Sequence, residues 1–349
     1  MTWMIYGANG YTAGLIVDTA LARGHRPILA GRHPQKVLEI AQTKGLPARI
    51  FDLSDEAATT RQLEGISLVL HCAGPFSQTS RPMLDACIRA QAHYLDITGE
   101  IDVFEAIFAR QQELKDAGIT AIPGVGFDVV PSDCLAALLK EKLPSADHLT
   151  LAFVPRNSRT SPGTAKTMVE GLSKGGKVRL GGHIVTVPSA YHTRTVPFSD
   201  GALPASTIPW GDVSTAFHST AIPNIEVYLG MTKTQINGAR LAGKFRWLFA
   251  TACVQNFLKH RVERQVIGPS ADRRARASMS LWGEARNAQG ASVTLSLRTP
   301  DGYSLTADAA VRAVERLLKA PPTPGAQTPS QAFGADFVKE LEGVEIIAP

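Results

Sequence analysis

Residues 7–14, Gly-Ala-Asn-Gly-Tyr-Thr-Ala-Gly, have the composition and spacing of a phosphate-binding turn. They follow the apolar run of residues 2–6 and precede residues 15–17, Leu-Ile-Val, which open a helical pattern. Glycines let the backbone approach a diphosphate, and the first N–H groups of a helix attract its charge. The spacing is G-x-x-G rather than G-x-G-x-x-G, so a tight strand–helix turn without a ligand is the alternative. The residues expected to bind are Gly7, Ala8, Asn9, Gly10, Tyr11 and Thr12.

Arg32 follows the apolar residues 27–30, which form the second predicted strand. A site for NAD usually carries Asp or Glu at this strand end, to accept a hydrogen bond from the ribose 2′-OH. A guanidinium group instead suits a 2′-phosphate. We therefore expect NADP, as NADPH, to be the cofactor. The alternative is that Arg32 is a solvated surface residue.

Small and polar residues also follow the next two predicted strands, residues 48–51 and 68–71. In an open α/β sheet the ligand lies at the carboxyl ends of the strands. Asp52 is expected near the adenine, although it could instead cap the next helix. Cys72 is better explained as a small packed residue than as a nucleophile. The cofactor-binding residues predicted at these two ends are Asp52, Leu53, Cys72, Ala73, Gly74, Pro75 and Phe76.

Glu100 and Asp128 are the candidates for a catalytic acid, because each follows a later predicted strand, residues 94–97 and 120–122. A hydride transfer to a double bond needs a group that supplies a proton. Each carboxylate also has a structural alternative. Glu100 could be a favourable carboxylate at a helix N-terminus, and Asp128 could start the helix that follows.

Size and composition indicate an ordinary globular protein with an anionic ligand. The chain has 349 residues, enough for two domains, with 44% hydrophobic residues and a net charge of +5. No basic stripe is interleaved with aromatic residues, so nucleic acid is not an expected partner. The four cysteines form no metal-binding or disulfide pattern, which fits a reducing compartment. We expect a cytoplasmic homodimer without metal, signal peptide or transmembrane segment.

The order of the predicted elements indicates an α/β protein with a Rossmann doubly wound parallel sheet and a second mixed α/β domain. The predicted helices of the first part are residues 34–43, 55–63, 80–90 and 103–117. Later strands are expected at 149–154, 177–187, 225–229, 277–284 and 292–298, and later helices at 131–143, 164–174, 241–263, 306–320 and 332–341. We place the NADP-binding domain at residues 1–125, completed by about 305–349, and a substrate or dimerisation domain at 126–304.

The segment 244–264 combines an apolar, aromatic centre with basic ends. A core or dimer-interface helix explains this pattern simply. The alternative is a surface that contacts lipid or lines a channel for an acyl chain, which would include peripheral membrane contact.

Several segments resemble the saccharopine dehydrogenase-like oxidoreductases, including the mycobacterial trans-acting enoyl reductases. Asn9 and Ala13 stand where that family has Thr and Gly, and a tight turn tolerates both. The resemblance is specific within the first 135 residues. The similar segments are residues 7–14, 30–32, 72–76, 93–100, 126–133 and 331–337.

The resemblance implies an NAD(P)-dependent oxidoreductase that transfers hydride to a C=C, C=O or C=N bond of a small molecule. We find no set of Arg and Lys residues suited to several substrate carboxylates, which favours an apolar or acyl substrate. The alternatives are a saccharopine-type amino-acid dehydrogenase and a non-catalytic NADP-sensing protein.

Overall fold

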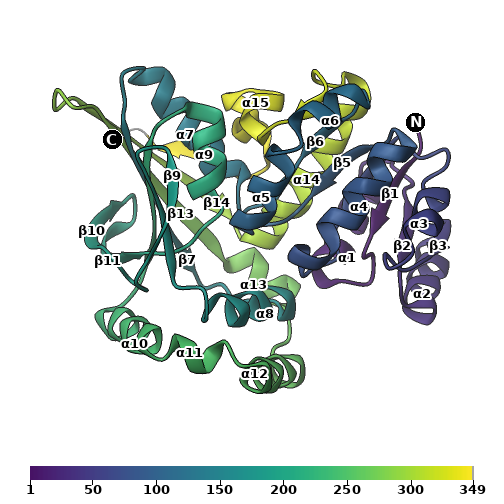
Figure 1. Ribbon diagram of the computed structural model, residues 1–349, viewed down its shortest axis with the longest axis horizontal. Helices are drawn as coiled ribbons and strands as arrows, with labels where there is room; N and C mark the ends of the chain where they lie inside the picture. Colours follow the sequence, from purple (N-terminus) through teal and green to yellow (C-terminus); the bar gives the residue numbers. More distant parts are fainter. Residues whose placement is uncertain (348–349) are drawn as a thin grey trace. The chain divides into compact units, whose positions relative to one another are not determined.

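The computed structural model describes residues 1–347 and divides the chain into two compact units (Figure 1). The first unit contains Met1–Val130 and Tyr303–Phe337, and the second contains Pro131–Gly302 and the chain from Val338 onward. These bounds lie within a few residues of the expected 125 and 305. The last segment differs from expectation, because the chain from Val338 onward belongs to the second unit. There a strand, β16 (Glu345–Ile347), pairs with the second sheet.

The first unit contains a seven-stranded, entirely parallel sheet with the order β15-β6-β5-β4-β1-β2-β3. The order reverses between β1 and β4, which defines the doubly wound fold and confirms the predicted fold class. The strands are four residues or fewer, and β1, β2 and β4 are buried along their whole length. Such buried apolar runs are typical of parallel sheets covered by helices. Their bounds are β1 (Trp3–Tyr6), β2 (Ile28–Gly31), β3 (Ala48–Ile50), β4 (Leu68–His71), β5 (His93–Asp96), β6 (Thr120–Ile122) and β15 (Gly325–Ala326).

The helices of the first unit follow the strands as expected, with three corrections. The predicted helix 103–117 is two helices, because the backbone leaves helical geometry at Arg110. The predicted helix 80–90 begins at Phe76, and the predicted helix 332–341 is broken at Gly334, whose φ is +90°. The helices are α1 (Tyr11–Ala22), α2 (Pro34–Lys44), α3 (Glu56–Gln62), α4 (Phe76–Ala90), α5 (Ile101–Phe108), α6 (Gln111–Asp116), α14 (Gly302–Lys319), α15 (Pro329–Phe333) and a 3₁₀ helix (Ala335–Glu340).

The long helix α14 ties the end of the chain to the first unit. Its apolar residues recur at helical spacing, and Leu305, Val311 and Val314 are completely buried. Arg23, at the end of α1, forms ion pairs with Asp308 and Glu315 of α14. α1 and α14 therefore lie side by side, although almost 300 residues separate them in sequence.

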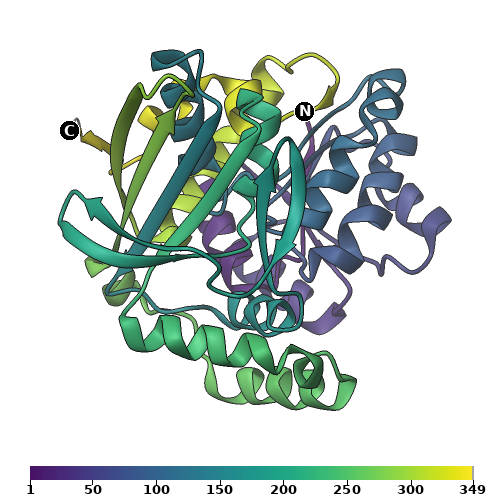
Figure 2. The same ribbon diagram turned by 60° about the vertical axis from the view of Figure 1, so that its left-hand side comes forward.

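The second unit contains a nine-stranded mixed sheet with the order β10-β11-β12-β7-β13-β14-β16 and a side hairpin, β8–β9 (Figure 2). Only β12 and β7 pair in parallel in this part of the described chain. This confirms the predicted mixed α/β domain. The strands are β7 (His148–Arg156), β8 (Gly176–Leu180), β9 (His183–Val187), β10 (Thr193–Phe198), β11 (Gly201–Thr207), β12 (Asn224–Gly230), β13 (Ser278–Arg286) and β14 (Ser292–Pro300).

Helices of the second unit differ from expectation mainly between residues 233 and 276. The predicted helix 241–263 is three helices, and α9 and α13 were not expected. α7 packs closely on the sheet at Gly283, where a Cβ atom would lie 2.7 Å from the side chain of Leu139. The helices are α7 (Val130–Lys142), α8 (Pro162–Gly171), α9 (Asp212–Thr220), α10 (Lys233–Lys244), α11 (Arg246–Phe249), α12 (Ala252–Gln265) and α13 (Ala271–Arg276).

Candidate cofactor and active site

Gly7 forms the corner between β1 and α1, at the point where the strand order of the sheet reverses. Its φ is +86°, and its N–H donates to the carbonyl oxygen of Ala30 over 2.8 Å. A Cβ atom at Gly7 would lie 2.7 Å from the backbone nitrogen of Ala73, in the loop after β4. Only glycine satisfies both the backbone angle and this contact. The loops after β1 and β4 therefore meet where a doubly wound sheet binds its ligand.

The first turn of α1 begins at Gly10, the N-cap residue. Within the described chain no side chain caps this helix end. Ala8 donates to the Ala30 carbonyl over 3.1 Å, which closes the turn toward β2. The ring of Tyr11 packs edge-on against Tyr303 at 5.2 Å. A helix start without a side-chain cap suits a diphosphate.

Asn9 stands where the usual glycine corner has its second glycine, and its side chain lies beside the end of β2. Asn9 Oδ1 lies 3.5 Å from the position of a Cβ atom on Gly31, the last residue of β2. The side chain thus lies against the strand end that carries Arg32. Asn9 also lines a shallow depression beside α2, together with Lys36, Glu39, Ile40, Thr43 and Lys44.

Arg32 is exposed at the end of β2, and its Nε lies 3.3 Å from Nε2 of His33. Hydrogen bonds from Ser54 lower the pKa of Asp52, and the charge of Arg32 lowers it further. Arg32 therefore lies close enough to Asp52 for their charges to interact. A guanidinium group in this place can bind a 2′-phosphate.

The side chain of Asp52 stabilises a turn and does not cap a helix. Its Oδ1 accepts from the Ser54 N–H over 2.8 Å, whereas the cap of α3 is Asp55, which accepts from Ala58 over 2.9 Å. Capping by Asp52, the alternative considered above, is therefore wrong. Leu53 is half-buried and packs against the core of the unit.

The segment from Cys72 to Phe76 crosses the end of β4. Burial raises the pKa of the Cys72 thiol far above its usual range, which supports the interpretation as a packed residue. The Gly74–Pro75 peptide bond is cis. Phe76 begins α4 and packs edge-on against the ring of buried His71 at 5.4 Å.

Glu100 joins the loop after β5 to the loop after β4. Its two carboxylate oxygens accept from the N–H groups of Phe76 and Ser77, each over 3.0 Å. The carboxylate thus holds the first turn of α4. Protonation of Glu100 would remove one of these acceptors, so the geometry suits a positioning residue better than a proton donor.

Asp128, in the loop after β6, is a candidate proton donor. It is half-buried and has no hydrogen-bond partner among residues 1–347. Burial raises its pKa to about 6. A Cβ atom on Gly99 would lie 2.8 Å from Asp128 Oδ2, so glycine leaves room for the carboxyl group. Thr306 of α14 accepts from the Phe127 N–H over 3.0 Å and holds the loop in place.

Asp96 is a site residue that the sequence analysis missed. It is completely buried at the end of β5, and Oδ1 accepts from the N–H groups of Thr98 (3.0 Å) and Gly124 (2.8 Å). Oδ2 accepts from the Tyr94 hydroxyl over 2.7 Å. These bonds tie the ends of β5 and β6, which carry Glu100 and Asp128. In the sequence, the feature that could have identified Asp96 is a single carboxylate at the end of an apolar strand.

Asp96→Ala is expected to lower the free energy of unfolding by about 3–5 kcal/mol, because three buried donors lose their acceptor. Urea unfolding measures this, and Asp96→Asn is the control that keeps an acceptor oxygen.

Burial raises the pKa of Asp96 to about 6. Folded Asp96 therefore keeps a proton that the unfolded chain releases near pH 3.9, so its contribution to stability falls as pH rises from about 4 to about 6. Asp128 titrates in the same pH range, so the loss of stability with rising pH should be smaller in Asp96→Asn but still present. A loss of the same size as in the unaltered protein would contradict the raised pKa of Asp96.

The second unit holds a separate polar depression of about 620 Å³. Asn157, Ser158 and Arg159, which follow β7, line one side of it. Ser270, Asp272, Arg273 and Arg276 of the α13 region line the other side. Three arginines with one carboxylate can bind an anionic group. Folding thus brings together three arginines from two distant segments that the sequence does not show as a set.

Within residues 1–347, no group of three His, Cys, Asp or Glu side chains is arranged to hold a metal ion. These residues also contain no helix that is both long enough and apolar enough to cross a membrane.

The doubly wound sheet, the glycine corner and Arg32 define a dinucleotide-binding unit. The family model of the saccharopine dehydrogenase NADP binding domain matches residues 3–122. This match confirms the predicted resemblance and the assignment of NADP.

Two kinds of curated oxidoreductase resemble the chain. A saccharopine dehydrogenase-like oxidoreductase from Bos taurus is 27% identical over 195 residues, which are 48% of this chain and 45% of the relative. A trans-acting enoyl reductase from Mycobacterium ulcerans is 29% identical over 139 residues, 37% of this chain and 33% of the relative. The chain thus matches less than half the length of these relatives.

Among solved structures, apo saccharopine dehydrogenase (L-Glu forming) from Saccharomyces cerevisiae is similar in fold. The TM-score is 0.67 at 13% sequence identity, and the match covers 99% of this chain and 100% of that chain. At this identity the likeness shows the fold of both units, and it carries no conclusion about the substrate.

Proposed function

We propose that the protein is an NADPH-dependent reductase. The observation that carries this proposal is Arg32 beside a glycine corner whose Gly7 lies against Ala73 at the reversal of the sheet. The backbone of residues 7–12 would hold the diphosphate, and Arg32 with His33 would hold the 2′-phosphate. When bound there, NADPH supplies the hydride.

The residues after β5 and β6 would complete the reaction. Asp128, with a pKa raised by burial, would give its proton to the substrate atom that becomes more basic as the double bond is reduced. Glu100 would hold the start of α4, and Asp96 would hold both loops at a fixed spacing. In this assignment Glu100 and Asp96 are positioning residues.

Two observations bear on the substrate. The relatives named as trans-acting enoyl reductases favour an acyl substrate with a C=C bond, and C=O and C=N bonds are the other options. The cluster of Arg159, Arg273 and Arg276 favours a substrate with an anionic group and keeps a saccharopine-type amino-acid dehydrogenase as the second candidate.

A substrate panel tests the proposal. Purified protein is incubated with NADPH and enoyl, imine and carbonyl substrates, and the loss of NADPH absorbance is followed. We expect oxidation with at least one class. Glutamate-dependent oxidation would favour the amino-acid dehydrogenase, whereas tight NADPH binding without turnover across the panel would favour an NADP-sensing protein.

Arg32→Asp is expected to weaken NADPH binding by roughly tenfold or more and to spare NADH, because a charge-assisted hydrogen bond contributes about 1.5–3 kcal/mol. Fluorescence titration with both cofactors measures the change. Arg81→Asp is a matched control, because Arg81 carries the same charge on an exposed part of α4. Equal affinity of the unaltered protein for NADPH and NADH would contradict the role of Arg32.

We also propose a reducing compartment such as the cytoplasm, which the four free cysteines support. The homodimer remains a prediction.

A further inference from the structure

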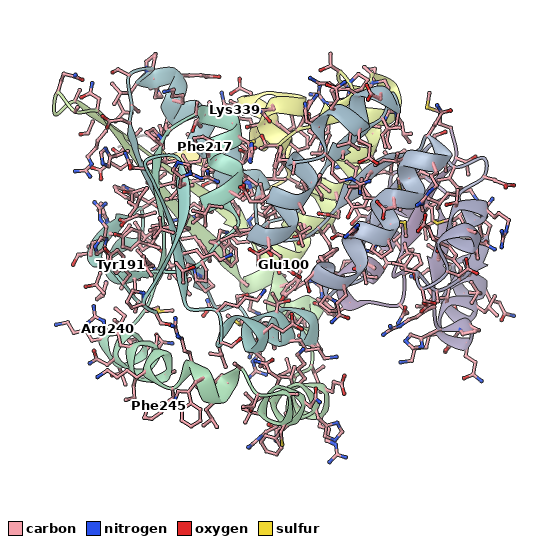
Figure 3. All side chains as sticks on the ribbon, in the orientation of Figure 1. Glu100, Tyr191, Phe217, Arg240, Phe245 and Lys339 are labelled. Atoms are coloured by element: carbon pink, nitrogen blue, oxygen red, sulfur yellow. The ribbon has the colours of Figure 1, made fainter. Side chains whose placement is uncertain are left out.

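The helices α10, α11 and α12 of the second unit expose large apolar side chains. Trp247 is 67% exposed, Phe257 is 62% exposed and Phe245 is 48% exposed. Leu241 and Leu248 are exposed as well, at 58% and 41%, on either side of the break between α10 and α11. Figure 3 shows Phe245 on the side of the helices that faces away from the sheet of this unit. The prediction of a core helix for residues 244–264 is therefore wrong.

These helices are attached to their unit mainly by polar contacts. Of the described residues in α10, Ile236 alone is buried, and α11 and α12 have no buried residue. Lys259 forms an ion pair with Glu170 of α8, and Glu263 forms one with Lys166. The exposed apolar side chains are therefore left without a partner in their own unit. Figure 2 shows the three helices, in green, below the strands of the sheet.

The charge around this face is strongly basic. Residues 233–265 contain seven Lys and Arg residues and a single acidic residue, Glu263. Lys244 and Arg246 lie on either side of Phe245, and both are exposed. Aromatic rings flanked by basic side chains are typical of helices that lie in the headgroup region of a membrane.

We propose that α10–α12 form a docking surface for an anionic lipid bilayer. Phe245, Trp247 and Phe257 would enter the boundary between headgroups and acyl chains, and Lys244, Arg246 and Arg264 would contact anionic headgroups. A second copy of this chain fits less well. A two-fold interface brings the same patch together twice, so seven positive charges would face seven others across the contact. This inference concerns the second unit and does not depend on the proposed reductase activity.

Trp247 provides a direct measurement of this docking. Of the four tryptophans, Trp3 and Trp282 are buried, Trp210 is half-buried, and Trp247 is the most exposed. The full chain is mixed with vesicles of phosphatidylcholine, with or without one-quarter phosphatidylglycerol. We expect co-sedimentation with the anionic vesicles, weakening at high salt, together with a blue shift of tryptophan fluorescence. Trp247→Phe should keep the binding and lose the blue shift.

Three variants complete the experiment. The double variant Phe245→Ala/Trp247→Ala should weaken vesicle binding by at least about tenfold, and Lys244→Glu/Arg246→Glu should weaken it to a similar extent. Leu180→Ala is the control, because Leu180 is an exposed apolar residue of β8, outside the patch. Each variant changes exposed side chains, and thermal unfolding checks that it folds.

Absence of binding to anionic vesicles would overturn the proposal. So would binding that survives both double variants, or self-association at this face in place of vesicle binding.

Discussion

Asp128→Asn is expected to lower kcat by about 10²–10⁴-fold, the usual contribution of a positioned acid or base. The substitution keeps the size of the side chain and removes the proton that Asp128 would donate. It lies outside the glycine corner, so NADPH affinity should change little. Stopped-flow measurement of NADPH oxidation, together with a separate NADPH titration, distinguishes a lost proton donor from a lost cofactor site.

The pH dependence gives this prediction a second readout. Burial raises the pKa of Asp128 to about 6. Asp128 must carry a proton in order to donate it. Because this proton is lost as pH rises through about 6, kcat should fall over the same range. Asp128→Asn should lack this fall. Glu100→Gln serves as the comparison, because it perturbs the start of α4 and should leave the titration in place. An Asp128→Asn enzyme with unchanged kcat and pH profile would remove Asp128 from the mechanism.

Gly7→Val is expected to lower the free energy of unfolding by about 2–4 kcal/mol and to abolish measurable NADPH binding. Two effects combine at this position. A β-branched residue is strained at a φ of +86°, and its Cβ atom would lie 2.7 Å from the backbone nitrogen of Ala73. Backbone on both sides of the contact would have to move, which would separate the two loops that form the proposed diphosphate site.

Gly14→Ala is the matched control for this second prediction. Gly14 lies inside α1, and a Cβ atom there has no neighbour within 4 Å among the described residues. Alanine favours a helix by up to about 1 kcal/mol over glycine, so this variant should be as stable as the natural protein or slightly more so. Urea unfolding and NADPH titration of both variants form the test. Retained cofactor binding in Gly7→Val would show that the corner is not the diphosphate site.

The parallel sheet could be predicted from the sequence because several of its strands, such as β1, β2 and β4, are short apolar runs that end at or just before a glycine or a polar residue. β4 and β6 have the predicted bounds, residues 68–71 and 120–122. The hairpin β8–β9 was predicted as one strand, residues 177–187, because alternation continues on both sides of its turn. Gly181 and Gly182, with φ of +56° and +83°, are the residues that reverse the chain there.

Site residues divide in a similar way. The glycine corner and Arg32 could be found because local spacing specifies them. Asp96 and the cluster of Arg159, Arg273 and Arg276 could not, since their roles depend on partners distant in the chain. Glu100 was identified at the correct strand end, but its attachment to Phe76 and Ser77 is a tertiary contact that no local pattern contains.

The interrupted first unit has a consequence for biosynthesis. A nascent chain that has reached Val130 lacks α14 and β15, which supply Thr306 beneath the Asp128 loop and the strand beside β6. The ribosome must then translate Pro131–Gly302, the larger part of the second unit, before these parts emerge. Until that moment β6 is an uncovered edge, so a stalled or truncated translation product should be a substrate for chaperones and proteases.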